Sequence, residues 1–386
     1  MRSRNAEGPR VGVDLTALLP DRTGVDVSMV GLVSSLASLN GGASYTVFVN
    51  AEDRRTISAM LPPEVKVVPL ALRSRPVRLF FQQVLLPLAA AARRLDIVHS
   101  PSFIMPLCRG GTRHVVTIHD LTFFSLPALH ERLRRSTAFL RAVRASIRRA
   151  DIVTVPTESV ATELHGLMPD VPPERVRVVA WGVDQAFRVL PDATVAATTR
   201  RLGLPSRYIL TVGKLQPRKN LTTLVAAYRR LLETTDLAEH LVLAGPLGWG
   251  YEPMLAEIAH PTLRDRVHRL GYVAQEDLPA VYAGATLLAY PSVDEGFGFP
   301  PLEAMACGVP VVASDIRVLR ETLGDAALLV PATDAAALAA AIHRIVVEPG
   351  ARDDHRARGL ERVRAFGWDR TAQAMHRCYV ELAARP

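Results

Sequence analysis

The 386-residue sequence is poor in cysteine and lysine and has no long hydrophobic run. Its three cysteines lie far apart and form no CxxC pair, which excludes a disulfide framework or a zinc ribbon and is typical of a reducing compartment. The apolar stretches, such as Leu85–Ala92, are too short to span a bilayer, and no long apolar segment precedes a cleavage site near the N-terminus. We therefore expect a cytoplasmic protein.

Several familiar ligand-binding motifs are also missing. The sequence has no GxxxxGK[ST] and no GxGxxG, so neither a P-loop nor a dinucleotide fingerprint is expected. No histidine or acid follows His119 at the helical spacing of a metal site, and we expect no bound metal. No recognised nucleic-acid motif accompanies the basic residues, so nucleic acid is not an expected partner.

The composition present is that of a globular protein, with 49% hydrophobic and 22% charged residues. Short β-branched runs alternate with helical patterns, which predicts parallel sheets covered by helices. This alternation of strand and helix patterns occurs in two separate series along the chain. We therefore predict an α/β protein of two Rossmann-like domains, with the ligand site in the cleft between them. The predicted division is an N-terminal domain at 1–190, a C-terminal domain at 191–366 and a final helix at 367–386 that crosses back to the N-terminal domain. The predicted strands are Val11–Leu15, Tyr45–Val49, Ile97–His99, Val115–His119, Ile152–Val155, Tyr208–Val212, His240–Ala244, Val267–Leu270, Leu287–Tyr290 and Val309–Ala313.

The net charge of +8 is concentrated in the first half of the chain. Residues 1–195 hold 24 basic and 17 acidic groups, whereas residues 196–386 hold 22 and 21. This asymmetry indicates an anionic partner for the N-terminal half.

A basic cluster, Gly213–Asn220, directly follows the predicted strand Tyr208–Val212. Arg218 and Lys219 would lie close to the start of the next helix, whose free N–H groups favour anions. The cluster is either a phosphate site or a solvated basic turn.

A second cluster, Glu295–Glu303, follows the predicted strand Leu287–Tyr290 and opens a short helix. Gly296 and Gly298 let the backbone approach a ligand closely and present its amides. Glu303, in the first turn of the helix, could accept hydrogen bonds from the vicinal hydroxyls of a ribose. The alternatives are a carboxylate placed by the helix dipole, ordinary loop glycines, and core packing for Phe297 and Phe299.

The third feature is His119, which ends the apolar strand Val115–His119. A lone histidine is often structural, but the carboxyl end of a parallel strand is where ligands bind.

Taken together, these segments resemble a known family. The E-x7-E spacing of Glu295 and Glu303 within EGFGFPPLEAMACGVPVVASD, with GKLQPRKN and TIHD, resembles the retaining glycosyltransferases of family four, which have the GT-B fold. The resemblance covers nearly the whole chain and is strongest over Tyr208–Val330.

The resemblance implies a role for each of these residues. The catalytic candidates are His119, beside the donor sugar, and Glu295, on its hydroxyls. Arg218 and Lys219 would clamp the diphosphate, and Glu303 would bind the ribose. The further donor-binding residues implied are Gly24, Gly271, Tyr272, Val273, Leu278, Gly296, Phe297, Gly298, Phe299 and Leu302.

Some positions depart from the family pattern. Asp26 replaces a small residue close to the expected phosphates, where a carboxylate is unfavourable, so it would point away or the loop is aligned differently. Trp181 occupies a position at which family members often have asparagine. Lys214 either joins the phosphate clamp or does not contribute to it.

The implied function is transfer of a hexosyl group from a nucleotide-diphosphate sugar, with GDP-mannose as the first choice, to a glycan, glycolipid or small glycoside. No other cofactor is implied. A sugar-nucleotide epimerase or a non-catalytic nucleotide-sugar-binding relative is the alternative. A phosphorylase would need a lysine for pyridoxal phosphate, and the chain has only Lys66, Lys214 and Lys219.

A helix expected at Arg132–Arg149 is a candidate explanation for the excess of positive charge in the N-terminal half. It combines an apolar face with seven arginines over Glu131–Arg149. It would either touch an anionic membrane, placing the protein at the inner membrane face, or pack as a surface helix with a solvated basic face.

Overall fold

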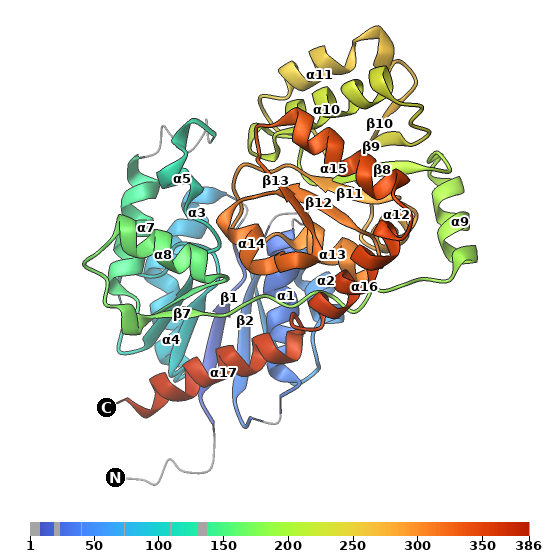
Figure 1. The fold of residues 1–386 in the computed structure, drawn as a ribbon. Helices are drawn as coiled ribbons and strands as arrows, with labels where there is room; N and C mark the ends of the chain where they lie inside the picture. The colour runs from blue at the N-terminus through green and yellow to red at the C-terminus, as the bar shows by residue number, and fades with distance from the viewer. Residues whose placement is uncertain are drawn as a thin grey trace. The chain divides into compact units, whose positions relative to one another are not determined.

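The computed structural model describes residues 8–18, 24–39, 41–72, 74–108, 110–129 and 137–385. The chain forms two compact units (Figure 1). Unit 1 contains Met1–Gly182 and Phe366–Pro386, and unit 2 contains Val183–Ala365.

Unit 1 is a parallel sheet with the strand order β3-β2-β1-β4-β5-β6-β7 among its described residues. Its strands are β1 (Arg10–Asp14), β2 (Ser44–Asn50), β3 (Lys66–Leu70), β4 (Ile97–Ser100), β5 (Arg113–Thr117), β6 (Ile152–Val155) and β7 (Val176–Val178). Its helices are α1 (Gly24–Ala37), α2 (Arg54–Met60), α3 (Arg75–Phe80), the π-helical turn η2 (Phe81–Leu85), α4 (Leu86–Ala92), α5 (Thr122–Ser125), α7 (Thr137–Arg149), α8 (Glu158–Leu167) and α17 (Trp368–Ala384).

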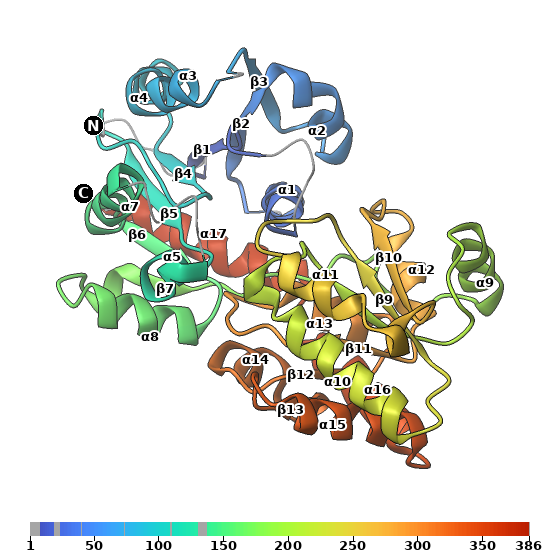
Figure 2. The same ribbon diagram turned by 90° about the horizontal axis from the view of Figure 1, so that it is seen from above.

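Helices cover both faces of the unit 1 sheet. The chain moves one way along the sheet from β1 through α1 to β2, and the other way from β3 through α4 to β4 and from β5 through α7 to β6. Because parallel crossovers are right-handed, α4 and α7 share one face and α1 lies on the other. Figure 2 shows this arrangement, with α17 on the same side as α1.

Unit 2 repeats the architecture with the parallel order β10-β9-β8-β11-β12-β13. Its strands are β8 (Tyr208–Val212), β9 (His240–Ala244), β10 (Val267–Gly271), β11 (Leu287–Tyr290), β12 (Val311–Ser314) and β13 (Leu328–Val330). Its helices are α9 (Asp192–Arg201), the short 3-10 turn η5 (Pro217–Lys219), α10 (Leu221–Thr234), α11 (Glu252–Ile258), α12 (Leu278–Ala283), α13 (Phe299–Ala306), α14 (Arg317–Leu323), α15 (Ala335–Val347) and α16 (Ala351–Val363).

The prediction of two Rossmann-like domains is confirmed, but the sequence patterns missed three edge strands. These are β3, β7 and β13, none of which has a fully buried residue. β7 and β13 have only three residues each, and Pro69 interrupts the apolar pattern of β3, so none of the three shows the run of four or more strand-forming residues by which the other strands were recognised.

The boundary between the units falls after Gly182, earlier than the 190/191 border that we expected. The physical reason is the packing of the intervening residues. Phe187 is 5% exposed and its ring lies edge-on to Tyr282 of α12, with centroids 5.8 Å apart. The segment after Gly182 therefore belongs to unit 2.

The last helix, α17, belongs to unit 1 and packs against α1. The Tyr379 hydroxyl lies 2.7 Å from His99 Nδ1, and His99 Nε2 lies 2.8 Å from the Thr117 hydroxyl. Burial, aided by the nearby His119, lowers the pKa of His99 to about 3, so this network is uncharged at neutral pH. Trp368 packs so closely on Gly182 that an added Cβ would lie 2.6 Å from it. These contacts join the two chain segments of unit 1.

Candidate donor site

The basic cluster of unit 2 is held in place by Asn220, at the end of the η5 turn. Asn220 adopts a left-handed conformation with φ 53°, which asparagine tolerates better than most residues. Its side-chain amide donates to the carbonyl oxygens of Pro291, at 3.1 Å, and Ala332, at 2.6 Å. The turn after β8 is thereby fixed to the segments that follow β11 and β13, and all three lie at the carboxyl edge of the sheet.

Arg218 and Lys219 converge on the carboxylate of Glu295. Arg218 Nη1 lies 2.5 Å from Glu295 Oε2, and Lys219 Nζ lies 2.6 Å from Oε1. Tyr290, the last residue of β11, donates from its hydroxyl to the same Oε1 at 2.8 Å and lies 2.6 Å from Lys219 Nζ. Two residues predicted to bind phosphate and one predicted to bind sugar therefore form a single buried cluster.

The charge state of Glu295 follows from these contacts. Burial alone would raise the pKa of this carboxyl, but the charges and hydrogen bonds of Arg218 and Lys219 outweigh it and hold the pKa well below its usual range. The same burial, together with the negative charge of Glu295, raises the pKa of Tyr290 well above its ordinary value. Glu295 is therefore an ionised acceptor at neutral pH, and Tyr290 is a neutral donor.

The glycine-rich loop leads directly into α13. Gly298 precedes this helix at φ 92°, and an added Cβ would lie 2.8 Å from the Leu319 side chain. Gly296 and Phe297 are buried, and the Phe297 ring lies edge-on to Phe299 with centroids 5.0 Å apart. Phe297 therefore packs in the core, which is the alternative that we gave to ligand binding for this aromatic ring.

The start of α13 offers few backbone donors. Pro300 and Pro301 have no N–H group, and in a regular helix that begins at Phe299 the Leu302 amide bonds back to the Gly298 carbonyl. The amides of Gly298 and Phe299 are thus the donors that the helix itself leaves unpaired. This shifts the backbone part of the predicted phosphate contact away from Leu302, whose side chain is fully buried.

Glu303 lies on α13, facing α12. The Tyr282 hydroxyl donates to Glu303 Oε2 at 2.7 Å. Burial raises the pKa of Glu303 to about 7, with the charge of Asp184 adding to the rise while Tyr282 and Lys219 oppose it. Glu303 therefore differs from Glu295: it changes its charge close to neutral pH.

The segment expected to hold the nucleotide base follows β10. Gly271 has φ 71°, and its carbonyl accepts from the Gly245 amide at 2.7 Å. Tyr272 is 60% exposed, so its ring is open for stacking, while Val273 and Leu278, the first residue of α12, are half-buried. Because the strands of unit 2 are parallel, this segment lies at the same sheet edge as the other clusters.

His119 lies in unit 1, two residues beyond the end of β5, rather than at the strand end that we expected. Its Nε2 lies 2.6 Å from the Pro101 carbonyl oxygen, and its ring stacks on Trp181 with centroids 5.5 Å apart. Burial lowers the pKa of His119, although the bond to Pro101 and the charges of Asp120 and Asp26 oppose this. A carbonyl only accepts, so Nε2 carries the proton and Nδ1 of the neutral ring is an acceptor.

Two further predictions concern the start of α1. Gly24 is the first residue of that helix, while Thr23, before it, lies outside the described residues. Asp26 is 4% exposed and its charge acts on His119. Trp181, which departs from the family pattern, is the stacking partner of His119.

The sequence patterns did not identify the hydroxyl partners of the two glutamates. Tyr290 could have been found, because it ends a predicted strand next to Glu295. Tyr282 has no such signal, since it lies on a helix and meets Glu303 only through tertiary packing.

Two kinds of feature are absent from the described part of the chain. No group of three or more histidine, cysteine, aspartate or glutamate side chains is placed to hold a metal ion there. Nor is any helix in those ranges both long and apolar enough to cross a membrane.

Comparisons with known proteins show the family to which the chain belongs. The sequence model described as "Glycosyltransferase Family 4" matches residues 22–187, and that described as "Glycosyl transferases group 1" matches residues 200–362. The O-antigen chain mannosyltransferase B of Escherichia coli is 32% identical over 274 residues, which cover 71% of either chain. A D-inositol 3-phosphate glycosyltransferase of Kribbella flavida is 30% identical over 93% of this chain and 91% of its own.

A solved structure shows the same fold. Anabaena Alr3699/HepE, in complex with UDP-glucose, superposes with a TM-score of 0.77 over 96% of this chain and 99% of its own, at 17% identity. The two Rossmann-like units have the GT-B fold. The chain belongs to glycosyltransferase family four, of the group 1 type.

Proposed function

We propose that this glycosyltransferase moves a mannosyl group from GDP-mannose to an acceptor hydroxyl of a glycan, glycolipid or small glycoside, with retention of the anomeric configuration. The observation that carries the proposal is the cluster of Arg218, Lys219 and ionised Glu295 at the carboxyl edge of the unit 2 sheet. The similarity to an O-antigen mannosyltransferase supports the choice of sugar.

The two cations support a reaction in which a nucleoside diphosphate leaves. The bond between the anomeric carbon and the phosphate oxygen breaks, and negative charge grows on the diphosphate. Lys219 is buried, Arg218 is half-buried, and both are held by Glu295, so they would stabilise that charge without first reorganising, and the transfer would need no metal ion. For this they would turn part of their hydrogen bonding from Glu295 to the diphosphate.

Glu295 is the candidate for accepting hydrogen bonds from the donor-sugar hydroxyls. It could do so once Arg218 and Lys219 also bind the diphosphate. Glu303 would accept from the ribose hydroxyls, and the exposed Tyr272 ring would stack on the base. His119 would accept a further sugar hydroxyl at Nδ1. The acceptor oxygen would bond to the anomeric carbon on the face that the diphosphate leaves, and a phosphate oxygen would take its proton.

An inositol phosphate is the second candidate acceptor. The long alignment with a D-inositol 3-phosphate glycosyltransferase favours it. The donor base is a separate question, because the structurally similar Alr3699/HepE is bound to UDP-glucose.

The test is an assay of transfer with donor and acceptor panels, followed by NMR of the product. We expect GDP-mannose to give a product with the donor's α configuration, while epimerisation of the free donor stays absent. A β-linked product would contradict retention. Turnover with UDP-glucose alone would contradict the choice of donor, and epimerisation without transfer would support the alternative enzyme class.

A further inference from the structure

Phe103, in the loop after β4, has a backbone conformation that is rare for its residue type. Its φ is 59°, in the left-handed region, where a bulky side chain is strained. The residue follows the end of β4 at the carboxyl edge of the unit 1 sheet, and its amide donates to the Thr117 carbonyl of the neighbouring strand β5 at 3.1 Å. Because ligands bind at this edge, the strain there indicates a function for Phe103.

The backbone that follows Phe103 is anchored by side chains from two other elements. The Gln82 side chain, in η2, donates to the Ile104 carbonyl at 2.9 Å. The Met105 amide donates to the Ser146 hydroxyl of α7 at 3.1 Å. The turn at Phe103 is therefore held on one side by β5 and on the other by η2 and α7.

This conformation places the Phe103 ring against His119. The two rings lie edge-on with centroids 5.5 Å apart, and Trp181 stacks on His119 at the same centroid distance. Phe123 supports the Phe103 ring edge-on, with centroids 5.4 Å apart. His119 itself is 5% exposed, and its Nε2 lies 2.6 Å from the carbonyl oxygen of Pro101, in the same loop as Phe103. The imidazole is thus enclosed by two aromatic rings and one carbonyl.

These contacts determine which nitrogen of His119 is an acceptor. A neutral imidazole carries one proton, and the bond to Pro101 keeps that proton on Nε2 and the lone pair on Nδ1. Rotation of the ring about its Cβ–Cγ bond would take Nε2 away from the carbonyl, and the proton would then reside on either nitrogen. A protonated Nδ1 donates a hydrogen bond instead of accepting one. The rings on either side hinder this rotation.

We propose that Phe103 is a positioning residue that keeps His119 in its Nε2–H tautomer, with Nδ1 as the acceptor for a hydroxyl of the donor sugar. Glycine or asparagine adopts the left-handed conformation more readily, but neither has an aromatic ring to place against His119. The role of the tautomer in sugar binding rests on the proposed function, whereas the tautomer itself can be measured without any donor.

The first test is NMR of the imidazole nitrogens of the full chain at pH 7, without ligand. The signals of His119 are identified by their absence from His119→Phe. We expect the Nε2–H tautomer alone in the unmodified protein, and the Nδ1–H tautomer beside it in Phe103→Leu, which removes the ring. The Nε2–H tautomer alone in Phe103→Leu would overturn the proposal, whichever donor the enzyme uses.

The second test is a double-mutant cycle on kcat/KM for transfer from GDP-mannose. Phe103→Leu alone should lower kcat/KM roughly three- to tenfold, and no further than His119→Phe does. In the His119→Phe background the same change should cause no further loss, because Phe103 acts through His119. Equal losses in the two backgrounds would overturn the proposal in favour of a general structural role. Absence of transfer by the unmodified protein would contradict the proposed function, and the tautomer would still decide the role of Phe103.

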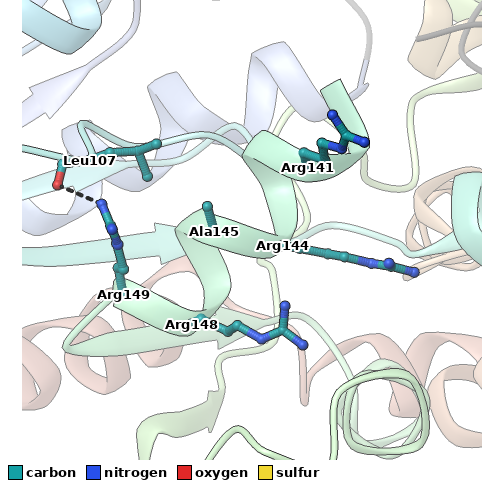
Figure 3. Close-up of a pocket in the computed structure, with 6 residues that line it drawn as sticks. All are labelled: Leu107, Arg141, Arg144, Ala145, Arg148 and Arg149. Carbon is teal, nitrogen blue, oxygen red and sulfur yellow. Dashed lines mark hydrogen bonds between the residues drawn. The ribbon is translucent and has the colours of Figure 1, made fainter. Parts of the chain in front are cut away.

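The matched control is Phe124→Leu, the same change at another half-buried ring of unit 1. The Phe124 ring contacts Phe123 and lies 4.9 Å from the guanidinium of Arg144, which lines a pocket on α7 (Figure 3). This helix is the described part of the basic helix expected from the sequence. The arginines before Thr137 that lie outside the described residues are Arg132, Arg134 and Arg135.

The control alters a ring that packs toward α7 rather than toward His119. Phe124→Leu should leave the His119 tautomer and kcat/KM unchanged. A change in both that equals the effect of Phe103→Leu would overturn the proposal in favour of a general loosening of the aromatic cluster.

Discussion

Replacing Lys219 by alanine tests whether the cation beside Glu295 stabilises the leaving diphosphate. The ammonium group is buried and lies 2.6 Å from both Glu295 Oε1 and the Tyr290 hydroxyl. Removing a fixed donor that faces developing charge costs about 3–4 kcal/mol of transition-state stabilisation, or roughly 100- to 1,000-fold in kcat. We expect a loss of this size for Lys219→Ala.

The fold should survive the same substitution. Arg218 remains within 2.5 Å of Glu295, so the carboxylate keeps one cation, and we expect a loss of about 1–3 kcal/mol in the free energy of unfolding. This is less than the total stability of an ordinary domain. A melting curve therefore separates loss of catalysis from loss of structure.

The assay is the initial rate of nucleoside diphosphate release in the presence of acceptor. The control is Lys214→Ala, which removes an exposed lysine from the same turn and should leave the rate within a few-fold of the original. Near-normal turnover by Lys219→Ala, or an equal loss in Lys214→Ala, would refute the reasoning.

Further predictions follow from the surroundings of four residues. Glu303 has a pKa of about 7 and must lose its proton to accept hydrogen bonds from two ribose hydroxyls, so donor affinity should rise with pH through 7. Glu303→Gln should abolish that dependence, which calorimetric titration at several pH values measures. Because the folded state raises the pKa of Glu303, folding favours its protonated form, and the stability of the protein should fall as the pH rises from about 4.5 to 7. Melting curves of Glu303→Gln should not show this fall. Gly298→Ala should lose about 1–3 kcal/mol in denaturant unfolding, because of its φ of 92° and the 2.8 Å approach to Leu319; an unchanged midpoint would contradict this. His119→Phe keeps a ring against Trp181 but removes Nδ1, so kcat/KM should fall roughly tenfold with only a small change in melting temperature. Tyr379→Phe removes the hydrogen-bond partner of His99 Nδ1 and should lower unit 1 stability by about 1–3 kcal/mol, whereas a loss no larger than that of the exposed Val380→Ala would count against the network.

The sequence was sufficient for much of the fold because the central strands carry continuous apolar runs. β6, β8, β9 and β11 have the bounds that the pattern predicted. The edge strand β13 was not found, since it has only three residues and is shorter than the runs by which strands are recognised. The domain border was placed too late because the packing of Phe187 on Tyr282 is a tertiary contact that local patterns do not reveal.

The same distinction applies to the candidate site. Arg218, Lys219, Glu295 and Glu303 could be singled out because each follows a recognisable strand or opens a helix. The pairing of Arg218 and Lys219 with Glu295 could not be predicted. An arginine and a lysine at these positions are equally consistent with binding a diphosphate and with binding a carboxylate. The opposite pKa shifts of the two glutamates also depend on tertiary structure: Arg218 and Lys219 lower the pKa of Glu295, while burial, aided by the charge of Asp184, raises the pKa of Glu303.

The most direct test of the central claim is a thermal-shift panel of GDP, UDP, dTDP and ADP with EDTA present, on the original protein and on Lys219→Ala. A ligand that binds only the folded state raises the melting temperature by mass action. We predict that GDP raises it without metal, and that Lys219→Ala loses most of this rise. A rise that is equal in both proteins, or no rise with any nucleotide, would contradict a nucleoside diphosphate site at Arg218, Lys219 and Glu295.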